Sequence, residues 1–351
     1  MRINGAQHLR TTRLPLDYSA GTPPLPRPTP SATANTAANR IAALQRFAGA
    51  ITLLNILGHL FFGFEQSWAQ LVTAIVTAYA MELLLEGIDA WSARRPTLFR
   101  GGCMRLLEFL LPAHITGMAI SMLLFAGDRL LPFAFAAAVG IASKALFQAS
   151  VGGRSRHFLN PSNTGIAVTL ILFSSVGIAP PYQFTETTGP VGDALLPAII
   201  VLSGTFLNAR FTGRIPLIVG WVGGFAIQAV LRAVLEGTPI AAGLNPMIGM
   251  AFTLFTFYMI SDPGTTPSEG KGQFLFGMSI AAAYAALMEM HIVFGLFFAL
   301  FAVCILRGIG LHLLACRSDR RGNPHPWSRL LPKGQKTSEP PIPGIGPGGR
   351  C

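Results

Sequence analysis

Two polar motifs, each at the end of a long apolar run, carry the residue types best suited to chemistry. The first reads Gly-Arg-Ser-Arg-His-Phe-Leu-Asn-Pro-Ser-Asn-Thr-Gly over residues 153–165, and the second reads Met-Ile-Ser-Asp-Pro-Gly-Thr-Thr-Pro over residues 259–267. Polar turns that face a low-dielectric interior need hydrogen-bond partners. Asn160 before Pro161 is typical of a helix start, where exposed amides attract a phosphate or a carbonyl oxygen. The alternative is a capped loop with a purely structural role.

These motifs supply most of the residues that we expect to contact a ligand. The predicted cofactor-binding residues are Asn160, Thr164, Asp262, Thr265, Thr266, Thr116, His114 and Lys144. A single histidine such as His114 is more often a hydrogen-bonded packing residue than a ligand. Lys144 lies near the end of an apolar segment, where it either extends toward the membrane surface or meets an anionic cofactor or a carboxylate. No catalytic residue is assigned.

Three carboxylates, Glu82, Glu86 and Asp89, fall on one face of a predicted helix. Glu82 is the deepest, and a carboxylate inside a membrane is costly unless it is paired or hydrated, so it is the candidate for an ion pathway. The alternative, favoured for Glu86 and Asp89, is an interfacial stripe that pairs with Arg94 or Arg105. No two histidines have metal or haem spacing, which predicts that no metal is bound.

The composition excludes a soluble protein. Of the 351 residues, 51% are hydrophobic and only 12% are charged, with a mean hydropathy of +0.51, whereas soluble domains carry roughly 25% charged residues. The net charge of +11 does not indicate nucleic-acid binding, because the positive residues lie mostly in the two tails and in alternate loops, as the positive-inside rule requires. The expected partner is therefore the lipid bilayer, and no nucleic acid is expected.

The sequence predicts an all-α polytopic membrane protein with about ten transmembrane helices. The apolar segments lie near residues 46–64, 69–90, 104–126, 130–149, 163–179, 194–209, 216–234, 244–261, 273–289 and 291–312. With both termini in the cytoplasm, Arg129 is the basic residue of the outer loops, and the inner loops hold Arg94, Arg95, Arg100, Arg154, Arg156, Arg210, Arg214 and Lys271. Residues 1–45 and 313–351 read as disordered cytosolic tails, the second of them basic, around a transmembrane domain at 46–312.

An internal repeat is indicated by two similar segments. Pro112-Ala-His-Ile-Thr-Gly-Met-Ala in the third segment aligns, with one gap, to Pro246-Met-Ile-Gly-Met-Ala in the eighth. Five segments separate them, so the two would cross the membrane in opposite senses, as in two inverted five-helix repeats. Proline-interrupted segments at matching places point to a cavity near the midplane between them. Chance similarity in a chain rich in small residues is the alternative.

The same motifs carry a family resemblance over about residues 48–310. Its first part consists of Lys144, Gly152-Gly153 and Phe158-Leu-Asn-Pro-Ser-Asn-Thr-Gly. Its second part consists of Met259-Ile-Ser-Asp-Pro-Gly-Thr-Thr-Pro and Gly270-Lys-Gly-Gln-Phe-Leu-Phe-Gly. They resemble the D subunit of the Rnf ferredoxin–NAD oxidoreductase complex and the B subunit of the sodium-pumping NADH:quinone reductase. Glu82 and Thr116 also fall where that family carries Glu and Thr. The resemblance implies two inverted repeats and flavin-mediated electron transfer, often linked to Na⁺ or H⁺ movement.

The resemblance also bears on how a flavin is held. The family carries FMN on a threonine of the loop after the fifth segment, in a Ser/Thr-Gly-Ala-Thr pattern, and here that loop reads Thr187-Thr-Gly-Pro-Val191. Because Val191 replaces the acceptor threonine and has no hydroxyl, we expect FMN or riboflavin to be bound non-covalently, although Thr187 or Thr188 could substitute. Divergent relatives also look like membrane proteins found with enediyne-type biosynthesis genes.

These features lead to one expected function and two alternatives. The expected function is a membrane subunit of an electron-transport oxidoreductase in the bacterial cytoplasmic membrane. It would bind a flavin or quinone and assemble with other membrane or redox subunits, coupled to ion movement or to natural-product biosynthesis. The first alternative is a transporter or exporter that uses the same cavity without redox chemistry. The second is a structural membrane subunit without a cofactor.

Overall fold

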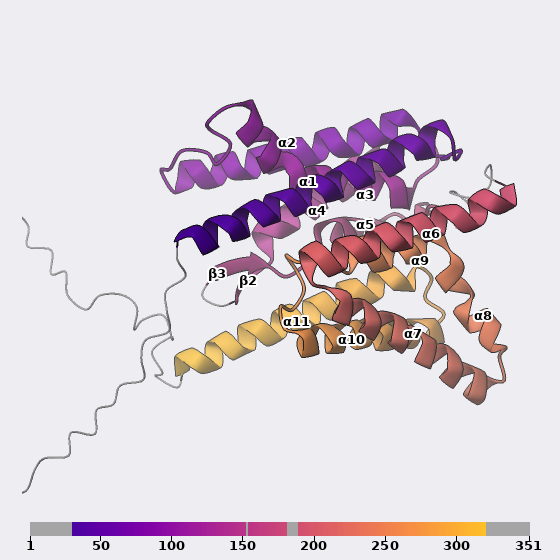
Figure 1. Cartoon of the computed structure of the whole chain (residues 1–351). Coiled ribbons are helices and arrows are strands. Elements are labelled where there is room, and N and C mark those ends of the chain that lie inside the picture. The colour runs from indigo at the N-terminus through magenta and orange to yellow at the C-terminus, as the bar shows by residue number, and fades with distance from the viewer. Residues whose placement is uncertain (1–29, 152–153, 181–188, 321–351) are drawn as a thin grey trace, which may run out of the picture. The chain divides into compact units, whose positions relative to one another are not determined.

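A computed structural model of the chain describes residues 30–151, 154–180 and 189–320. The contacts divide the chain after Ala38, and the residues from Asn39 onward form one compact unit. This part is mostly α-helical, as the sequence predicts (Figure 1). The α-helices are α1 (Pro30–Leu60), α2 (Trp68–Ser92), α3 (Cys103–Leu123), α4 (Leu131–Leu146), α5 (Pro161–Leu172), α6 (Gly189–Leu207), α7 (Ile215–Glu236), α8 (Ile240–Leu244), α9 (Met250–Leu254), α10 (Gly270–Glu289) and α11 (Gly295–Arg320).

Short irregular elements connect these helices. The π-helical turns η1 (Asn208–Thr212) and η3 (Phe255–Met259) follow α6 and α9, and the 3₁₀ turn η2 (Asn245–Ile248) precedes α9. Strand β1 (Leu124–Phe125) pairs antiparallel with β4 (Gly177–Ile178), and β2 (Gln148–Val151) pairs with β3 (Arg154–His157).

Six helices of the described residues are long and apolar enough to cross a membrane, or seven if the bent pair from α8 to η3 is one span. A span needs about 20 residues, whereas α4 has 16 and α5 has 12. The predicted count of ten spans is therefore not reached by length and composition. Two boundaries also differ, since α1 begins at Pro30 rather than near residue 46 and α11 ends at Arg320 rather than near 312. The rest of both predicted tails lies outside the described residues.

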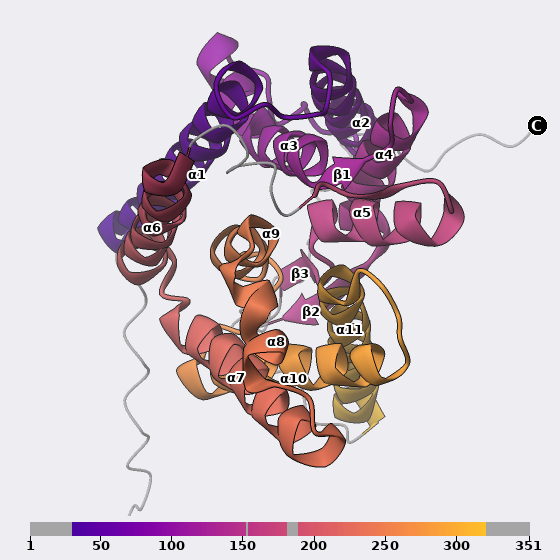
Figure 2. The same ribbon diagram turned by 90° about the vertical axis from the view of Figure 1, so that its right-hand side faces the viewer.

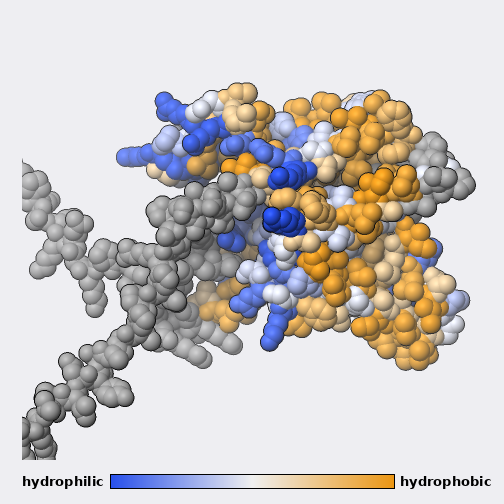
Figure 3. All heavy atoms as spheres, in the orientation of Figure 1, coloured by the Kyte–Doolittle hydropathy of each residue, from blue (hydrophilic) through white to orange (hydrophobic). Residues whose placement is uncertain are grey.

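Polar and apolar residues are distributed as a bilayer requires. On α2, Val72 and Val76 are 54% and 58% exposed, while Ala74 and Ala78 on the opposite face are fully buried. Polar side chains such as Asn55 are buried instead. Figure 3 shows hydrophobic residues over most of the face in view, with hydrophilic ones gathered at the end where β2 and β3 lie. Such broad exposed apolar surface is unusual for a soluble protein and suits lipid.

The third and eighth predicted segments differ in structure. Helix α3 runs unbroken through Pro112, and the Thr116 hydroxyl donates to the Pro112 carbonyl at 2.9 Å. The segment around Pro246 is broken, with a bend of 68° between the helical pieces 240–248 and 251–259. A proline inside a membrane helix is tolerated where neighbouring groups satisfy the backbone, so the expectation of an interruption in both segments is wrong for α3.

Glycines let neighbouring helices approach closely in two groups, one formed by α2, α4 and α5 and the other by α7, α10 and α11. Helix α4 contacts α2 and α5, and α10 contacts α7 and α11 in the same way (Figure 2). A Cβ added at Gly165 of α5 would lie 2.1 Å from the Ala136 carbonyl oxygen of α4. One added at Gly220 of α7 would lie 2.3 Å from the Phe274 carbonyl oxygen of α10. Small residues at helix interfaces are the usual means of such packing in membranes.

We predict that Gly220→Ala lowers the stability of the protein by roughly 1–3 kcal/mol, because the methyl group has to push α7 and α10 apart. The control is Gly223→Ala on the same helix, where an added Cβ meets no atom within 4 Å and alanine favours the helix by about 0.5–1 kcal/mol. Apparent unfolding temperatures in detergent measure both effects. Equal temperatures for the two variants would contradict the packing described here.

Candidate functional site

The first motif starts helix α5 as the sequence predicts. Asn160 is its N-cap, and its Oδ1 accepts hydrogen bonds from the Asn163 backbone N–H and the Ser162 hydroxyl, both at 3.0 Å. The Thr164 hydroxyl donates to the Asn160 carbonyl at 2.7 Å. Pro161, at the first turn, loses no hydrogen bond there because those amides have no helical partner. The capping oxygen is thus already engaged.

The second motif folds into a turn around its carboxylate. Asp262 Oδ1 accepts from the Gly264 N–H at 3.0 Å, and Oδ2 accepts from the Thr265 hydroxyl at 3.1 Å. The Thr266 hydroxyl donates to the Asp262 carbonyl at 2.7 Å. These bonds hold the turn in shape and use the polar groups that the sequence offers as ligand contacts.

The two motifs meet at the π-helical turn η3. Asn160 Nδ2 donates to the Met259 carbonyl at 3.0 Å, across 99 residues of sequence. On other sides of the turn, Asn208 Nδ2 donates to the Phe257 carbonyl at 2.8 Å, and Trp221 Nε1 donates to the Thr256 hydroxyl at 2.9 Å. Side chains from α5, η1 and α7 therefore converge on one irregular segment. Asn208 and Trp221 were not among the residues predicted from the sequence, although an asparagine within an apolar segment is itself a signal.

A cavity of about 230 Å³ lies beside this junction. Strand β3, the start of α7, the connection from η3 to α10 and helix α11 all contribute to its wall. The lining residues are Arg156, His157, Phe158, Arg214, Gly264, Thr266, Pro267, Ser268, Glu269, Gly272 and Arg307. Of the eight predicted ligand contacts, Thr266 lines this cavity. The other seven do not: Asn160, Thr164, Asp262, Thr265, Thr116, His114 and Lys144. From the sequence, Arg156 and Arg214 were predicted only to mark the orientation of the loops in the membrane.

Two of the cavity arginines are fixed by backbone carbonyls. Arg214 donates to the carbonyls of Pro267 at 2.6 Å and Pro263 at 3.3 Å, and Arg307 donates to the Thr265 carbonyl at 2.8 Å. Arg214 is only 7% exposed. Burial lowers the pKa of Arg214, the charges of Arg307 and Arg156 lower it further, and Asp262 raises it. Like charges therefore converge at the end of the second motif.

His114 and Thr116 lie in the helix packing instead. The His114 ring stacks on Tyr79, and its two nitrogens lie 2.8 Å from the Thr52 hydroxyl and 2.7 Å from the Tyr79 hydroxyl. Thr116 is buried and bonded within α3. These contacts agree with the alternative hypothesis that His114 is a hydrogen-bonded packing residue. It joins α1, α2 and α3.

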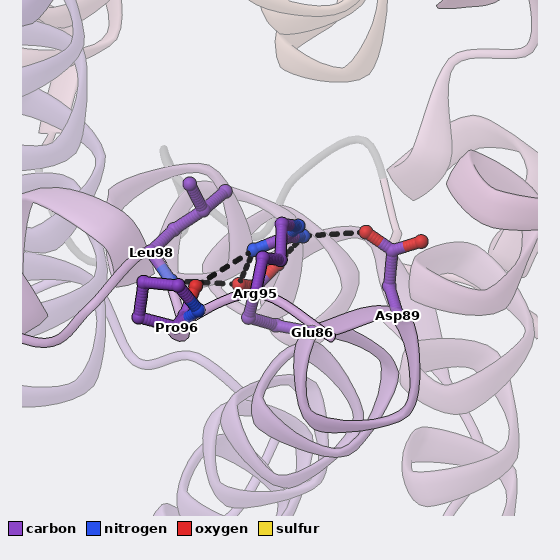
Figure 4. Close-up of polar contacts among 5 residues, drawn as sticks. All are labelled: Glu86, Asp89, Arg95, Pro96 and Leu98. Carbon is purple, nitrogen blue, oxygen red and sulfur yellow. Dashed lines mark hydrogen bonds and ion pairs between the residues drawn. The ribbon is translucent and has the colours of Figure 1, made fainter. Parts of the chain in front are cut away.

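The carboxylates of α2 all have cationic partners. Lys144 Nζ lies 2.6 Å from both oxygens of Glu82, and the two side chains are 18% and 14% exposed. Lys144 thus meets a carboxylate, one of the alternatives considered. Glu86 accepts two bonds from Arg95, at 2.7 and 3.0 Å, and Asp89 pairs with the same guanidinium (Figure 4). The partner expected for these two residues was Arg94 or Arg105, which is wrong, because the turn after α2 brings Arg95 back over the helix end.

Comparison with known proteins assigns no family to the chain, and the described residues contain no candidate metal cluster. No protein-family model matches the chain, and no curated protein matches it significantly. Over the described ranges, no group of three or more His, Cys, Asp or Glu side chains could hold a metal ion. Thr187 and Thr188, the substitute flavin acceptors, lie outside the described residues, as does the side chain of Val191.

We predict that Lys144→Met destabilises the protein by roughly 3 kcal/mol, because it leaves the Glu82 carboxylate buried without a partner. The double variant Glu82→Met/Lys144→Met removes both charges and should recover most of that loss. Unfolding temperatures in detergent test this pair of changes. If the double variant is no more stable than Lys144→Met, Glu82 and Lys144 are not each other's main partners.

Proposed function

We propose that this chain is a membrane subunit of an electron-transport oxidoreductase of the Rnf and sodium-pumping NADH:quinone reductase type, in which a flavin or quinone is held without a covalent link. The observation that carries the proposal is the hydrogen bond from Asn160 to the Met259 carbonyl. The two motifs that resemble this family are far apart in sequence, and the bond joins them into one polar cluster. A cluster of this kind, built by two halves of a membrane protein, is a usual place for a substrate or cofactor.

The internal repeat belongs to the same proposal. In the first half α2 packs on α4 and α4 on α5; in the second, α7 packs on α10 and α10 on α11. Asn55 of α1 donates to the Met118 carbonyl of α3 at 3.5 Å, as Asn208 donates to the Phe257 carbonyl of η3 at 2.8 Å. We infer two inverted five-helix repeats, in which α4, α5 and the broken segment from α8 to η3 act as short or interrupted spans.

The proposed orientation follows from the arginines. Arg156 of β3 and Arg214, just before α7, line one cavity together with Arg307 of α11, so the connections that carry Arg156 and Arg214 share one end of the unit. The positive-inside rule assigns that end to the cytoplasm. Both termini would then lie in the cytoplasm of a bacterium, with the chain in its inner membrane.

The cavity fits only part of the expected cofactor. Sites that enclose a small molecule measure about 300–1,000 Å³, and the cavity measures about 230 Å³. The threonine hydroxyls and the carboxylate of the second motif are also engaged in hydrogen bonds within the motif itself. This cavity alone therefore does not enclose a whole FMN or riboflavin, and no electron-transfer step is assigned to its residues. The proposal accordingly includes other membrane or redox subunits that would complete the site.

The Glu82–Lys144 pair is the proposed place for coupling to ion movement. It joins α2 to the last turn of the short apolar helix α4, and both side chains are largely buried. Intramembrane ion pairs of this kind mark ion pathways in many transporters. A link to enediyne-type biosynthesis remains part of the proposal through the resemblance alone.

A transporter is the second candidate, and the broken segment from α8 to η3 favours it. Its bend of 68° is of the type that places helix ends at a substrate site in secondary transporters. Such a protein would use the same cluster without redox chemistry. A structural subunit without a cofactor would need neither a ligand at this cluster nor redox chemistry.

We predict that the protein, extracted from its native membrane with its partner subunits in mild detergent, shows flavin absorbance that denaturation releases completely. Asp262→Ala should lose that absorbance while the protein still accumulates in the membrane, because the carboxylate holds the turn and does not face lipid. Ser279→Ala, an exposed hydroxyl on α10, is the control. Absence of flavin from the wild-type complex would favour the transporter, and a fluorescent band on a denaturing gel that Thr188→Ala removes would show a covalent acceptor.

A further inference from the structure

We propose that the cavity formed by β3, the start of α7, the connection before α10 and α11 binds an oxyanion of the phosphate class through Arg156, Arg214 and Arg307. This goes beyond the redox proposal and does not depend on it. The ligand is a phosphate group, either of a soluble phosphomonoester or of a phospholipid head group at the membrane surface. Its recognition rests on the number, placement and unused donors of the arginines.

The two inner arginines are held in place with donors to spare. A guanidinium carries five N–H donors in a rigid fork, which matches phosphate geometry. The bonds of Arg214 and Arg307 to the carbonyls of Pro263, Pro267 and Thr265 use only some of these donors. Arg214 Nε is buried and has no hydrogen-bond partner. A buried donor without a partner costs free energy, and an acceptor oxygen in the cavity is a direct way to recover it.

The charge of the cavity is positive. Three arginines line it, against the single carboxylate of Glu269. Asp262 lies near enough to affect Arg214, but its oxygens already accept bonds from its own turn. None of the three arginines forms an ion pair with a carboxylate among the residues that the structure describes. An anion between them would relieve their mutual repulsion, and charge-assisted bonds to a guanidinium are among the strongest in proteins.

The size of the cavity selects a small group. A volume of about 230 Å³, well above the roughly 10–15 Å³ that one buried water molecule needs, holds a phosphate group with some hydration. It is below the range of sites that enclose a whole organic ligand. One side of the cavity wall is also open to solvent, because Arg156 is exposed. The cavity therefore suits the charged end of a larger molecule, or the free ion.

The test uses the full chain in a neutral detergent and follows its unfolding temperature with inorganic phosphate, with phosphatidic acid, and with phosphatidylcholine as the lipid control. We expect phosphate or phosphatidic acid to raise the unfolding temperature. Arg156→Gln should weaken the effect about tenfold or more in the concentration required, because it removes one charge-assisted contact. Since Arg156 is exposed, this change should leave the fold intact.

The matched control is Arg210→Gln, which removes one exposed positive charge that does not line the cavity. Stabilisation by phosphate that Arg156→Gln weakens and Arg210→Gln does not would assign the site to a soluble phosphate group. Stabilisation by phosphatidic acid alone, with the same dependence, would assign it to a lipid head group. No stabilisation by either ligand, or an equal loss in both variants, would overturn the proposal. Neither result depends on whether the complex carries flavin.

Discussion

The structure depends on one requirement: backbone carbonyls released by an irregular segment inside an apolar protein need partners. In a bilayer, irregular backbone is tolerated only where protein groups or water satisfy it. The π-helical turn η3 has such carbonyls, and Asn160 and Asn208 donate to two of them, at Met259 and Phe257. Because these asparagines come from different helices, satisfying the backbone also fixes how α5 and η1 lie against the broken segment.

The same requirement shapes the region beyond η3. The chain leaves the broken helix through the Asp262 turn, whose carbonyls at Pro263 and Thr265 are bonded by Arg214 and Arg307. Arginines that bind carbonyls are held in place without losing their charge. The structural need of a loop at a helix end thus produces a cluster of fixed cations around a cavity, which is a suitable arrangement for an anion.

Sequence reasoning predicted local features and missed most long-range ones. Helix α2 and the Asn160 cap follow from apolar length and cap chemistry, which are local properties. The contact between Asn160 and Met259, 99 residues apart, follows from packing that no periodicity encodes. The interruption predicted at Pro112 is absent from α3, because neighbouring groups in the fold decide whether a proline interrupts a membrane helix. Arg214 was assigned to orientation, since burial and carbonyl contacts are visible only in the folded chain.

The most direct test of this account separates the two roles of Asn160. Asn160→Ser keeps an oxygen that can cap α5 but loses the amide donor that reaches the Met259 carbonyl. The control, Ser162→Ala, removes a bond to the same Asn160 side chain without touching η3. The account predicts that Asn160→Ser lowers the free energy of unfolding by about 1–3 kcal/mol and speeds hydrogen exchange across residues 255–262, while Ser162→Ala does neither. Unchanged stability and exchange in Asn160→Ser would contradict it.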